Sequence, residues 1–430
     1  MNARRTADAG LIAVVVSLAG AGSAHGDIVT EWNTTALNAI KSGSTPPPFA
    51  SRALALMHTA MYDANNAVTK TRQSYLPIPV APTGASREAA VAQAARNVLA
   101  TLYPSQAATF DAKLATHLSS IAPGQSRDDG VALGSTVASN FLAHRANDGS
   151  SAPTPWTPGN QPTSWKPTGG SATPLFNQFC LVQPWTMSGP SQFRQGAPAL
   201  PGSSEFVAAY NEVKELGSAT SATRTADQTE IAKFWAAGGG TVTPPGMWNN
   251  IAQVVSGQNS TSFDDNLRLF AVLNMATADA AITSWDMKFH YDYFRPVTGI
   301  RAMEDPSWTP LLTTPQFQAY TSGHSTFSSA SAAVLAAMFG DATNFSLTVT
   351  DASLGLTDVT RSFNSFTGAA AEAGQSRIYG GIHWQFDNTA GLVSGALVGA
   401  QAYANFLQVP TPGVGAVVAL GGLMALRRRR

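Results

Sequence analysis

Apolar residues recur at helical spacing along several long segments of this chain. In residues 52–68, 86–102 and 128–144, apolar side chains return every three or four positions, which is the period of an amphipathic helix. Alanine is abundant throughout and favours helix. The chain shows no internal repeat and no convincing strand-rich region. This pattern predicts an all-α protein.

Two segments break the helical pattern. Residues 148–202 contain many Pro, Gly, Ser and Thr residues and have no hydrophobic period, which predicts a long irregular connection or an arm that wraps the surface. A loop of that length inside a domain is usually functional or marks a boundary. Residues 236–245 form a second Gly/Pro-rich break. We therefore expect helices joined by long irregular loops.

Residues 1–26 have the pattern of a secretory signal peptide. Arg4 and Arg5 are followed by an apolar run over residues 11–18 and by small residues at 22–24. The run is shorter than a membrane span. We therefore expect an exported protein that is secreted, periplasmic or anchored at the cell surface.

Residues 409–430 form a second targeting segment. Pro410 and Pro412 precede an apolar stretch over residues 414–426, and four arginines follow it. This composition resembles the PEP-CTERM type of sorting tail, and a simple membrane-anchoring tail is the alternative. In either case we expect the tail to associate the protein with a membrane or the cell surface.

Charge and cysteine content narrow the classes of function. Only 12% of residues are charged, the net charge is zero and the sequence pI is about 7.1, so nothing indicates nucleic acid as a partner. Cys180 is the only cysteine, which excludes an intramolecular disulfide. In a chain with so few charges, a cluster of cations is informative.

Two cations lie near the end of a helix predicted over residues 267–294. Lys288 and Arg295 are seven residues apart, so a continuous helix would place them on one side, about 10 Å apart along its axis. Pro296 would end this helix at Arg295. Two such cations could hold a tetrahedral or trigonal oxyanion. A solvated charged face is the alternative explanation.

A Ser-Gly-His sequence precedes an Ala- and Ser-rich segment that continues to Phe339. Ser322 is well placed as a helix N-cap, Gly323 allows a ligand close to the backbone, and a helix N-terminus favours anions. His324 would lie beside such an anion as an acid–base group. A capped helix with an incidental histidine is the alternative.

A third segment contains Arg377, His383 and Asp387. Arg377 supplies another cation, and His383 and Asp387 are four residues apart. On a helix, that spacing lets Asp387 accept a hydrogen bond from one imidazole nitrogen, which leaves the other nitrogen as a ligand or nucleophile. A helix-stabilising His–Asp pair is the alternative.

Together, these three segments resemble a known superfamily. The order K-x6-RP, SGH and SR-x3-G-x-H-x3-D within 100 residues is similar to that of the vanadium-dependent haloperoxidases and the type 2 phosphatidic acid phosphatases. Thr321 stands where that superfamily usually has a proline before the serine. The likeness is strong over residues 265–400, and residues 57–64 resemble an N-terminal helix of bacterial haloperoxidase-like proteins.

The resemblance implies a fold and a cofactor. The family fold consists of two helical bundles of the four-helix type, which here implies a domain over residues 27–408, with an N-terminal part at 27–260 and the anion-site bundle at 261–408. The implied cofactor is vanadate. By the same resemblance, His383 would bind vanadium(V), Asp387 would orient His383, and His324 would be the acid–base group. The positions that match the vanadate-binding residues of the family are Lys288, Arg295, Ser322, Gly323, Arg377 and His383.

The same positions serve two activities in the superfamily. Haloperoxidases use hydrogen peroxide to oxidise a halide to hypohalous acid, which halogenates small organic substrates. In the phosphatases, the histidine that corresponds to His383 is a phosphorylated nucleophile. Trp285 and Phe317 match aromatic residues of the halide pocket in the chloroperoxidase branch, which favours oxidation of chloride or bromide. Ordinary packing of each residue in the hydrophobic core is the alternative. An exported acid phosphatase and a non-catalytic surface or matrix protein are the alternatives.

Overall fold

The computed structural model of the protein describes residues 27–409. The predicted signal peptide at 1–26 lies outside the described residues, as does the predicted sorting segment at 409–430 apart from its first residue. Between residues 27 and 409, no helix is both long enough and apolar enough to cross a membrane.

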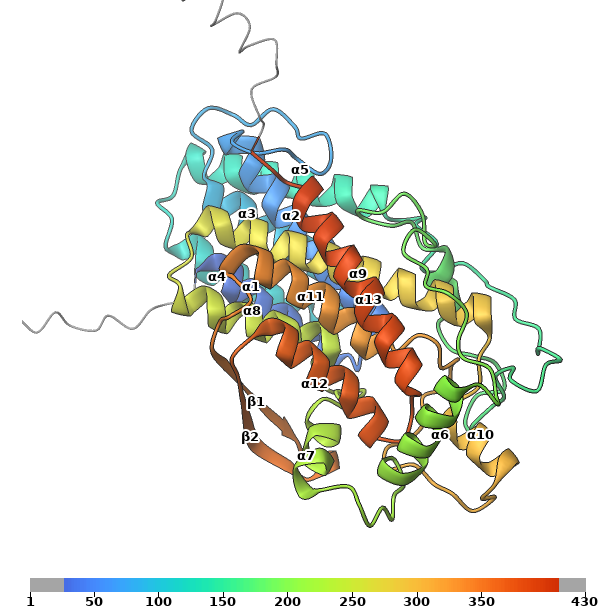
Figure 1. The fold of residues 1–430 in the computed structure, drawn as a ribbon. Coiled ribbons are helices and arrows are strands. Elements are labelled where there is room, and N and C mark those ends of the chain that lie inside the picture. The colour runs from blue at the N-terminus through green and yellow to red at the C-terminus, as the bar shows by residue number, and fades with distance from the viewer. Residues whose placement is uncertain (1–26, 410–430) are drawn as a thin grey trace, which may run out of the picture.

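Helices make up almost all of the regular structure (Figure 1). The α-helices, in chain order, are α1 (Ile28–Ser42), α2 (Pro47–Thr69), α3 (Arg87–Leu102), α4 (Ala107–Ser119), α5 (Gln125–His144), α6 (Ser204–Leu216), α7 (Ala226–Phe234), α8 (Thr243–Gln258), α9 (Phe263–Tyr291), α10 (Pro296–Met303), α11 (Gly323–Phe339), α12 (Phe366–Tyr379) and α13 (Gln385–Asn405). Short 3₁₀ turns occur at η1 (Pro104–Gln106), η2 (Asn177–Leu181) and η3 (Ala352–Leu354). Two strands, β1 (Phe345–Asp351) and β2 (Leu356–Phe363), form an antiparallel hairpin. The predicted all-α class is confirmed.

Helix α9 runs through the interior of the protein (Figure 1). Every residue from Asn266 to Lys288 is buried, as expected for a helix that other elements cover on all sides. Helices α2, α11 and α13 pack along it, and one hydrophobic cluster extends from α1 to α13. The predicted division after residue 260 falls in the turn between α8 and α9, and the hydrophobic core is continuous across it.

A row of glycines lets α13 pack closely against α11. Gly391, Gly395 and Gly399 recur every four residues and therefore share one face of α13. A β-carbon at Gly395 or Gly399 would lie only 2.3 Å from a backbone carbonyl oxygen of α11, which no real side chain tolerates. The N–H of Ser322 also donates to the carbonyl of Asp387 at 3.0 Å. This close packing brings the starts of the two helices together.

The predicted arm is irregular in the structure, and carboxylates of α9 anchor it. Between α5 and α6, the only helical or strand element is the short turn η2. Asp279 accepts hydrogen bonds from the backbone N–H groups of Trp185 and Thr186, both at 2.7 Å. Asp286 forms two hydrogen bonds of 2.7 Å with the guanidinium of Arg194. These bonds hold the arm along the second half of α9.

The helices predicted over residues 52–68, 86–102 and 128–144 are confirmed as parts of α2, α3 and α5. The hairpin was not predicted. Phe345 and Leu347 are buried and alternate with exposed serine and threonine, but two such short strands carry too few apolar positions to distinguish them from a loop. The predicted break at 236–245 is shorter than expected, because Pro244 and Pro245 belong to the first turn of α8, where proline is tolerated.

Candidate active site

The helix expected to carry both Lys288 and Arg295 ends earlier than predicted. Helix α9 stops at Tyr291, where Asp292 adopts a left-handed backbone conformation. Arg295 lies in extended backbone as the N-cap of α10, whose first residue is Pro296. The expectation that both cations lie along one helix is therefore wrong. Their approach to each other depends on tertiary folding.

Backbone carbonyls hold Lys288 in the interior. The side chain is fully buried, and its ammonium donates to the carbonyl oxygens of Gln318 at 2.9 Å, Ala319 at 3.0 Å and Thr321. These bonds use all three N–H groups of the ammonium. Lys288 therefore fixes the segment that leads into Ser322, and it contributes charge to the site rather than a free donor.

Arg295 joins three parts of the site. Its Nε donates to the Phe317 carbonyl at 2.7 Å, and its Nη1 donates both to the Ile382 carbonyl at 2.7 Å and to Nε2 of His383 at 2.9 Å. The guanidinium carbon of Arg295 and the ammonium nitrogen of Lys288 lie 5.0 and 5.2 Å from the ring centre of Phe317. This aromatic residue therefore contacts both cations.

The Ser-Gly-His sequence starts α11 as predicted. Ser322 is the N-cap, and its hydroxyl oxygen accepts a hydrogen bond from the N–H of Ser325 at 3.3 Å. Gly323 occupies the first helical position, where no carbonyl of the helix can accept the backbone N–H. Both residues are buried. The N–H of Gly323 and the hydroxyl hydrogen of Ser322 are thus donors at the positive end of a helix.

His324 is a neutral imidazole with a defined tautomer. Its Nε2 lies 3.2 Å from the carbonyl oxygen of Ala236, in the segment between α7 and α8. Because a carbonyl only accepts, we assign the hydrogen to Nε2 and a free lone pair to Nδ1. Burial and the charge of Arg377 hold the pKa of His324 well below its ordinary value, so the ring is neutral at pH 7. Sequence reasoning did not foresee this carbonyl partner, because a backbone acceptor leaves no signal in residue types.

The predicted bond between His383 and Asp387 forms, but not within a helix. His383 precedes α13, and its Nδ1 donates to Oδ2 of Asp387 at 2.8 Å. The same oxygen accepts the backbone N–H of Trp384 at 3.0 Å. This arrangement fixes the tautomer, so the lone pair of His383 is on Nε2, which accepts from Arg295. Burial lowers the pKa of His383 well below its ordinary value and raises the pKa of Asp387 to about 7.

Residues of all three predicted segments line a small cavity of about 50 Å³. Three prolines that the sequence analysis did not single out, Pro47, Pro244 and Pro315, form part of its wall. The predicted site residues that line it are Trp285, Phe317, Gly323, His324, Arg377 and His383. The other predicted residues lie behind this wall, and they are Lys288, Arg295, Ser322 and Asp387.

Unpaired buried donors lie in the cavity wall and directly behind it. Arg377 lies in the last turn of α12 and is 4% exposed, and its Nε and Nη1 find no acceptor among the described residues. Nη2 of Arg295 is buried and unpaired in the same way. A buried donor without an acceptor costs about 1–3 kcal/mol. Three such donors at one place indicate a site for an anion with several acceptor oxygens.

Positive charge predominates at the site. Burial lowers the pKa of Arg295 and Arg377 to about 9, and since this remains above neutral pH, both are cations at pH 7. Burial and Arg295 lower the pKa of Lys288 well below its ordinary value, but only the ammonium form has the three N–H bonds that its three carbonyl acceptors require, so these carbonyls favour the charged form. Within residues 27–409, Asp387 is the one carboxylate that contacts the predicted site residues, through its bond with His383. A tetrahedral oxyanion such as vanadate or phosphate fits these donors in both charge and hydrogen-bonding capacity.

The arm positions the aromatic wall of the cavity. Trp285 donates through Nε1 to the carbonyl of Leu175 at 3.3 Å, and the N–H of Leu175 donates to the carbonyl of Gln316 at 2.9 Å. The ring centre of Phe176 lies 6.3 Å from those of both Trp285 and Phe317. Two adjacent residues of the arm therefore support the two aromatic residues that the sequence had assigned to a halide pocket.

Comparison with known proteins identifies proteins that this chain resembles in sequence and fold. Residues 268–411 match the family model of the VCPO second helical-bundle domain. The vanadium chloroperoxidase of Curvularia inaequalis is 29% identical over 171 residues, and this match covers 32% of this chain but only 28% of that protein.

Two solved structures extend the likeness to most of the chain. A bacterial vanadium-dependent iodoperoxidase is similar with a TM-score of 0.81 and 26% identity, over 89% of this chain and 98% of that one. A holo-type bacterial vanadium-dependent chloroperoxidase has a TM-score of 0.68 and 19% identity, over 83% of this chain and 92% of that one. At that lower identity, the second likeness concerns the fold alone.

Proposed function

This chain belongs to the vanadium haloperoxidase family, and from that premise we propose that it binds vanadate and uses hydrogen peroxide to oxidise a halide. The observation that carries the proposal is the set of buried, unpaired guanidinium donors of Arg295 and Arg377 beside the imidazole of His383. Vanadate is an oxyanion with acceptor oxygens for such donors, and Nε2 of His383 would become its ligand once the N–H of Arg295 that now donates to Nε2 turns to an oxyanion oxygen.

Several residues would hold the cofactor, each through a group described above. Arg295 and Arg377 would donate their unpaired N–H groups, Gly323 its backbone N–H, and Ser322 its hydroxyl hydrogen. Lys288 would contribute positive charge near the cofactor, and it would hold in place the segment that leads into Ser322. When bound, vanadate supplies a Lewis-acidic centre that activates peroxide.

Proton transfer falls to His324. The net reaction consumes hydrogen peroxide, one halide ion and one proton, and it gives hypohalous acid and water. Because Nε2 of His324 is held by the Ala236 carbonyl, Nδ1 is the atom that accepts a proton as peroxide binds and returns it to the oxygen that leaves as water. A lowered pKa keeps this nitrogen unprotonated, and therefore ready to accept, at neutral pH.

We propose a chloroperoxidase-like enzyme that acts on chloride or bromide and halogenates small organic compounds. Trp285 and Phe317 support this choice, because both line the cavity and both match the aromatic residues of the halide pocket in the chloroperoxidase branch. Oxidation of iodide alone would refute the choice of halide while leaving the haloperoxidase proposal intact.

The test is a halide oxidation assay on protein reconstituted with vanadate. We expect peroxide-dependent activity that disappears in His383→Ala and remains in His290→Ala, which removes an exposed histidine of the last turn of α9. Phosphate release from a monoester, blocked by vanadate and without peroxide-dependent activity, would identify a phosphatase instead. No turnover of either kind, with vanadate affinity unchanged in His383→Ala, would identify a non-catalytic protein.

We further propose that the protein is exported and held at a membrane or cell surface by its C-terminal segment. The charged start and short apolar run of residues 1–26, and the arginine-terminated apolar stretch within 409–430, support this location. Cell fractionation of the full chain and of a variant without residues 409–430 tests it. Equal release of both forms would refute the role of the tail.

A further inference from the structure

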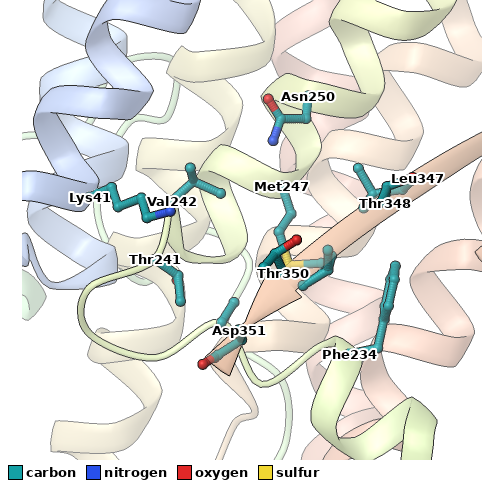
Figure 2. Close-up of a pocket in the computed structure, with 12 residues that line it drawn as sticks. Lys41, Phe234, Thr241, Val242, Met247, Asn250, Leu347, Thr348, Thr350 and Asp351 are labelled. Atoms are coloured by element: carbon teal, nitrogen blue, oxygen red, sulfur yellow. The ribbon is translucent and has the colours of Figure 1, made fainter. Parts of the chain in front are cut away.

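A second cavity, of about 180 Å³, lies beside the β-hairpin (Figure 2). Its walls come from the last turn of α1, the end of α7 and the segment after it, the first half of α8, and strand β1. None of its lining residues lines the cavity of the candidate active site. The second cavity is therefore a separate space, and the halide oxidation proposed above assigns it no role.

This second cavity combines apolar walls with a few polar groups. Its apolar lining includes Phe234, Val242, Met247, Leu347 and Val349. The amine of Lys41 and the amide of Asn250 are directed into the space, and Asp351 lies at the end of β1 (Figure 2). No ion pair within residues 27–409 includes Lys41. Asp351 accepts hydrogen bonds from the backbone N–H and the hydroxyl of Ser353, so its carboxylate already has partners outside the cavity lining. The unpaired ammonium of Lys41 beside apolar walls therefore suits a largely apolar ligand that carries one anionic group.

The two cavities share two segments of chain. Val242 lines the second cavity and Pro244 lines the first, and residues two positions apart have Cα atoms within about 7 Å of each other. Lys41, in the last turn of α1, lines the second cavity, and Pro47, the first residue of α2, lines the first cavity. The two spaces are therefore neighbours where α8 begins, and the end of α1 and the start of α2 each line one of them.

The volumes of the two cavities suit different ligands. A cavity that holds benzene measures about 150 Å³. The active-site cavity, at about 50 Å³, is too small for an aromatic ring. The second cavity, at about 180 Å³, has room for one ring with small substituents. An organic substrate therefore fits next to the site of halide oxidation but not within it.

We propose that the second cavity binds the organic acceptor of the halogenation, a single electron-rich aromatic ring with a carboxylate, such as a hydroxybenzoate. This inference rests on the proposed function, which supplies hypohalous acid as the co-reactant. The carboxylate pairs with Lys41, and the ring lies against the apolar walls. In the reaction, a carbon–halogen bond forms, the oxygen–halogen bond breaks, and the ring proton leaves with hydroxide as water.

Calorimetry with 4-hydroxybenzoate tests the proposal on the full chain without vanadate, peroxide or halide. We expect wild-type protein to bind the probe and Val349→Trp to bind it at least about tenfold more weakly, because the indole fills the cavity. Val359→Trp is the matched control. Val359 is the cross-strand partner of Val349, has similar exposure and does not line the cavity, so this variant should keep wild-type affinity.

Lys41→Gln tests the charge separately. We expect affinity for 4-hydroxybenzoate to fall about two- to fivefold, the effect of one exposed ion pair, and affinity for uncharged 4-hydroxybenzyl alcohol to stay the same. Absence of wild-type binding would overturn the proposal, as would equal loss for both probes. Iodide oxidation should persist in Val349→Trp and Lys41→Gln. Its absence from wild-type protein would refute the proposed function and leave the binding result standing.

Discussion

Replacing Arg377 with methionine tests whether the active-site cavity is built for an anion. In the ligand-free protein this guanidinium is buried, and its Nε and Nη1 have no acceptor among the described residues. Methionine has a similar length but neither charge nor donor. We therefore expect Arg377→Met to be more stable than the wild type without ligand, and to lose the stabilisation that vanadate gives.

The magnitude follows from the environment of Arg377. Two buried donors without acceptors cost about 2–6 kcal/mol together, at about 1–3 kcal/mol each. Burial lowers the pKa of Arg377 from 12.5 to about 9, which corresponds to a desolvation cost of roughly 5 kcal/mol. Water that enters the cavity satisfies part of this cost, so we expect a gain of about 2 kcal/mol. For a chain of this length, that gain raises Tm by about 2 °C.

Thermal unfolding with and without vanadate measures both effects. At a concentration of about 100 times Kd, a ligand stabilises the folded wild type by about 2.7 kcal/mol, and the variant should show no such response. Arg361→Met is the control, because Arg361 pairs with Glu372 and Asp227, both at 2.8 Å, away from the cavity. It should lower stability and keep the vanadate response. An Arg377→Met protein that is less stable without ligand, or that keeps the full response, would refute the reasoning.

Three further predictions concern packing, halide choice and pH. Gly395→Ala should lower the free energy of unfolding by about 1–3 kcal/mol, because the added methyl group meets a backbone carbonyl of α11. Gly257→Ala on α8 is the control, since its methyl group enters open space and should be neutral or stabilising, and urea unfolding compares the two variants. Phe176→Ala should raise iodide oxidation relative to chloride oxidation, because Phe176 supports both aromatic residues of the cavity wall, and an unchanged ratio in a competition assay would contradict that role. Burial lowers the pKa of His58 to about 3. As pH falls below 6.5, the unfolded chain therefore binds a proton that the folded protein does not, and His58 should cost up to about 1.4 kcal/mol of stability per pH unit. Urea midpoints at pH 7 and pH 5 should differ less in His58→Gln than in the wild type, and equal differences would disprove this contribution.

Features that depend on residues close together in the sequence could be predicted. Features that depend on where the chain leaves a helix and turns could not. The cap at Ser322 and the bond between His383 and Asp387 each depend on residues within four positions, so spacing alone predicted them. The prediction that Arg295 lies on the same helix as Lys288 was wrong. Helix α9 ends at Tyr291, because Asp292 adopts a left-handed conformation, and the chain leaves the helix before it reaches Pro296. Nothing in the local pattern distinguishes an aspartate that ends a helix from one that continues it.

The role of the arm shows the same limit. Its composition predicted an irregular segment, and the structure confirms that. Its path depends on Asp279, which binds backbone N–H groups more than 90 residues earlier in the chain, and residue types do not record such a partner. The support that Leu175 and Phe176 give to the cavity wall was therefore out of reach of sequence reasoning.

Main-chain carbonyls, rather than acidic side chains, occupy most of the donors of Lys288 and Arg295. A carbonyl is a neutral dipole, so it satisfies a donor without cancelling its charge. The ligand-free site therefore suits tetrahedral anions in general. Under the proposed function we expect phosphate to compete directly with vanadate, so the fraction of active enzyme should follow the ratio of these two anions and a phosphate-rich medium should inhibit the protein even where vanadium is present.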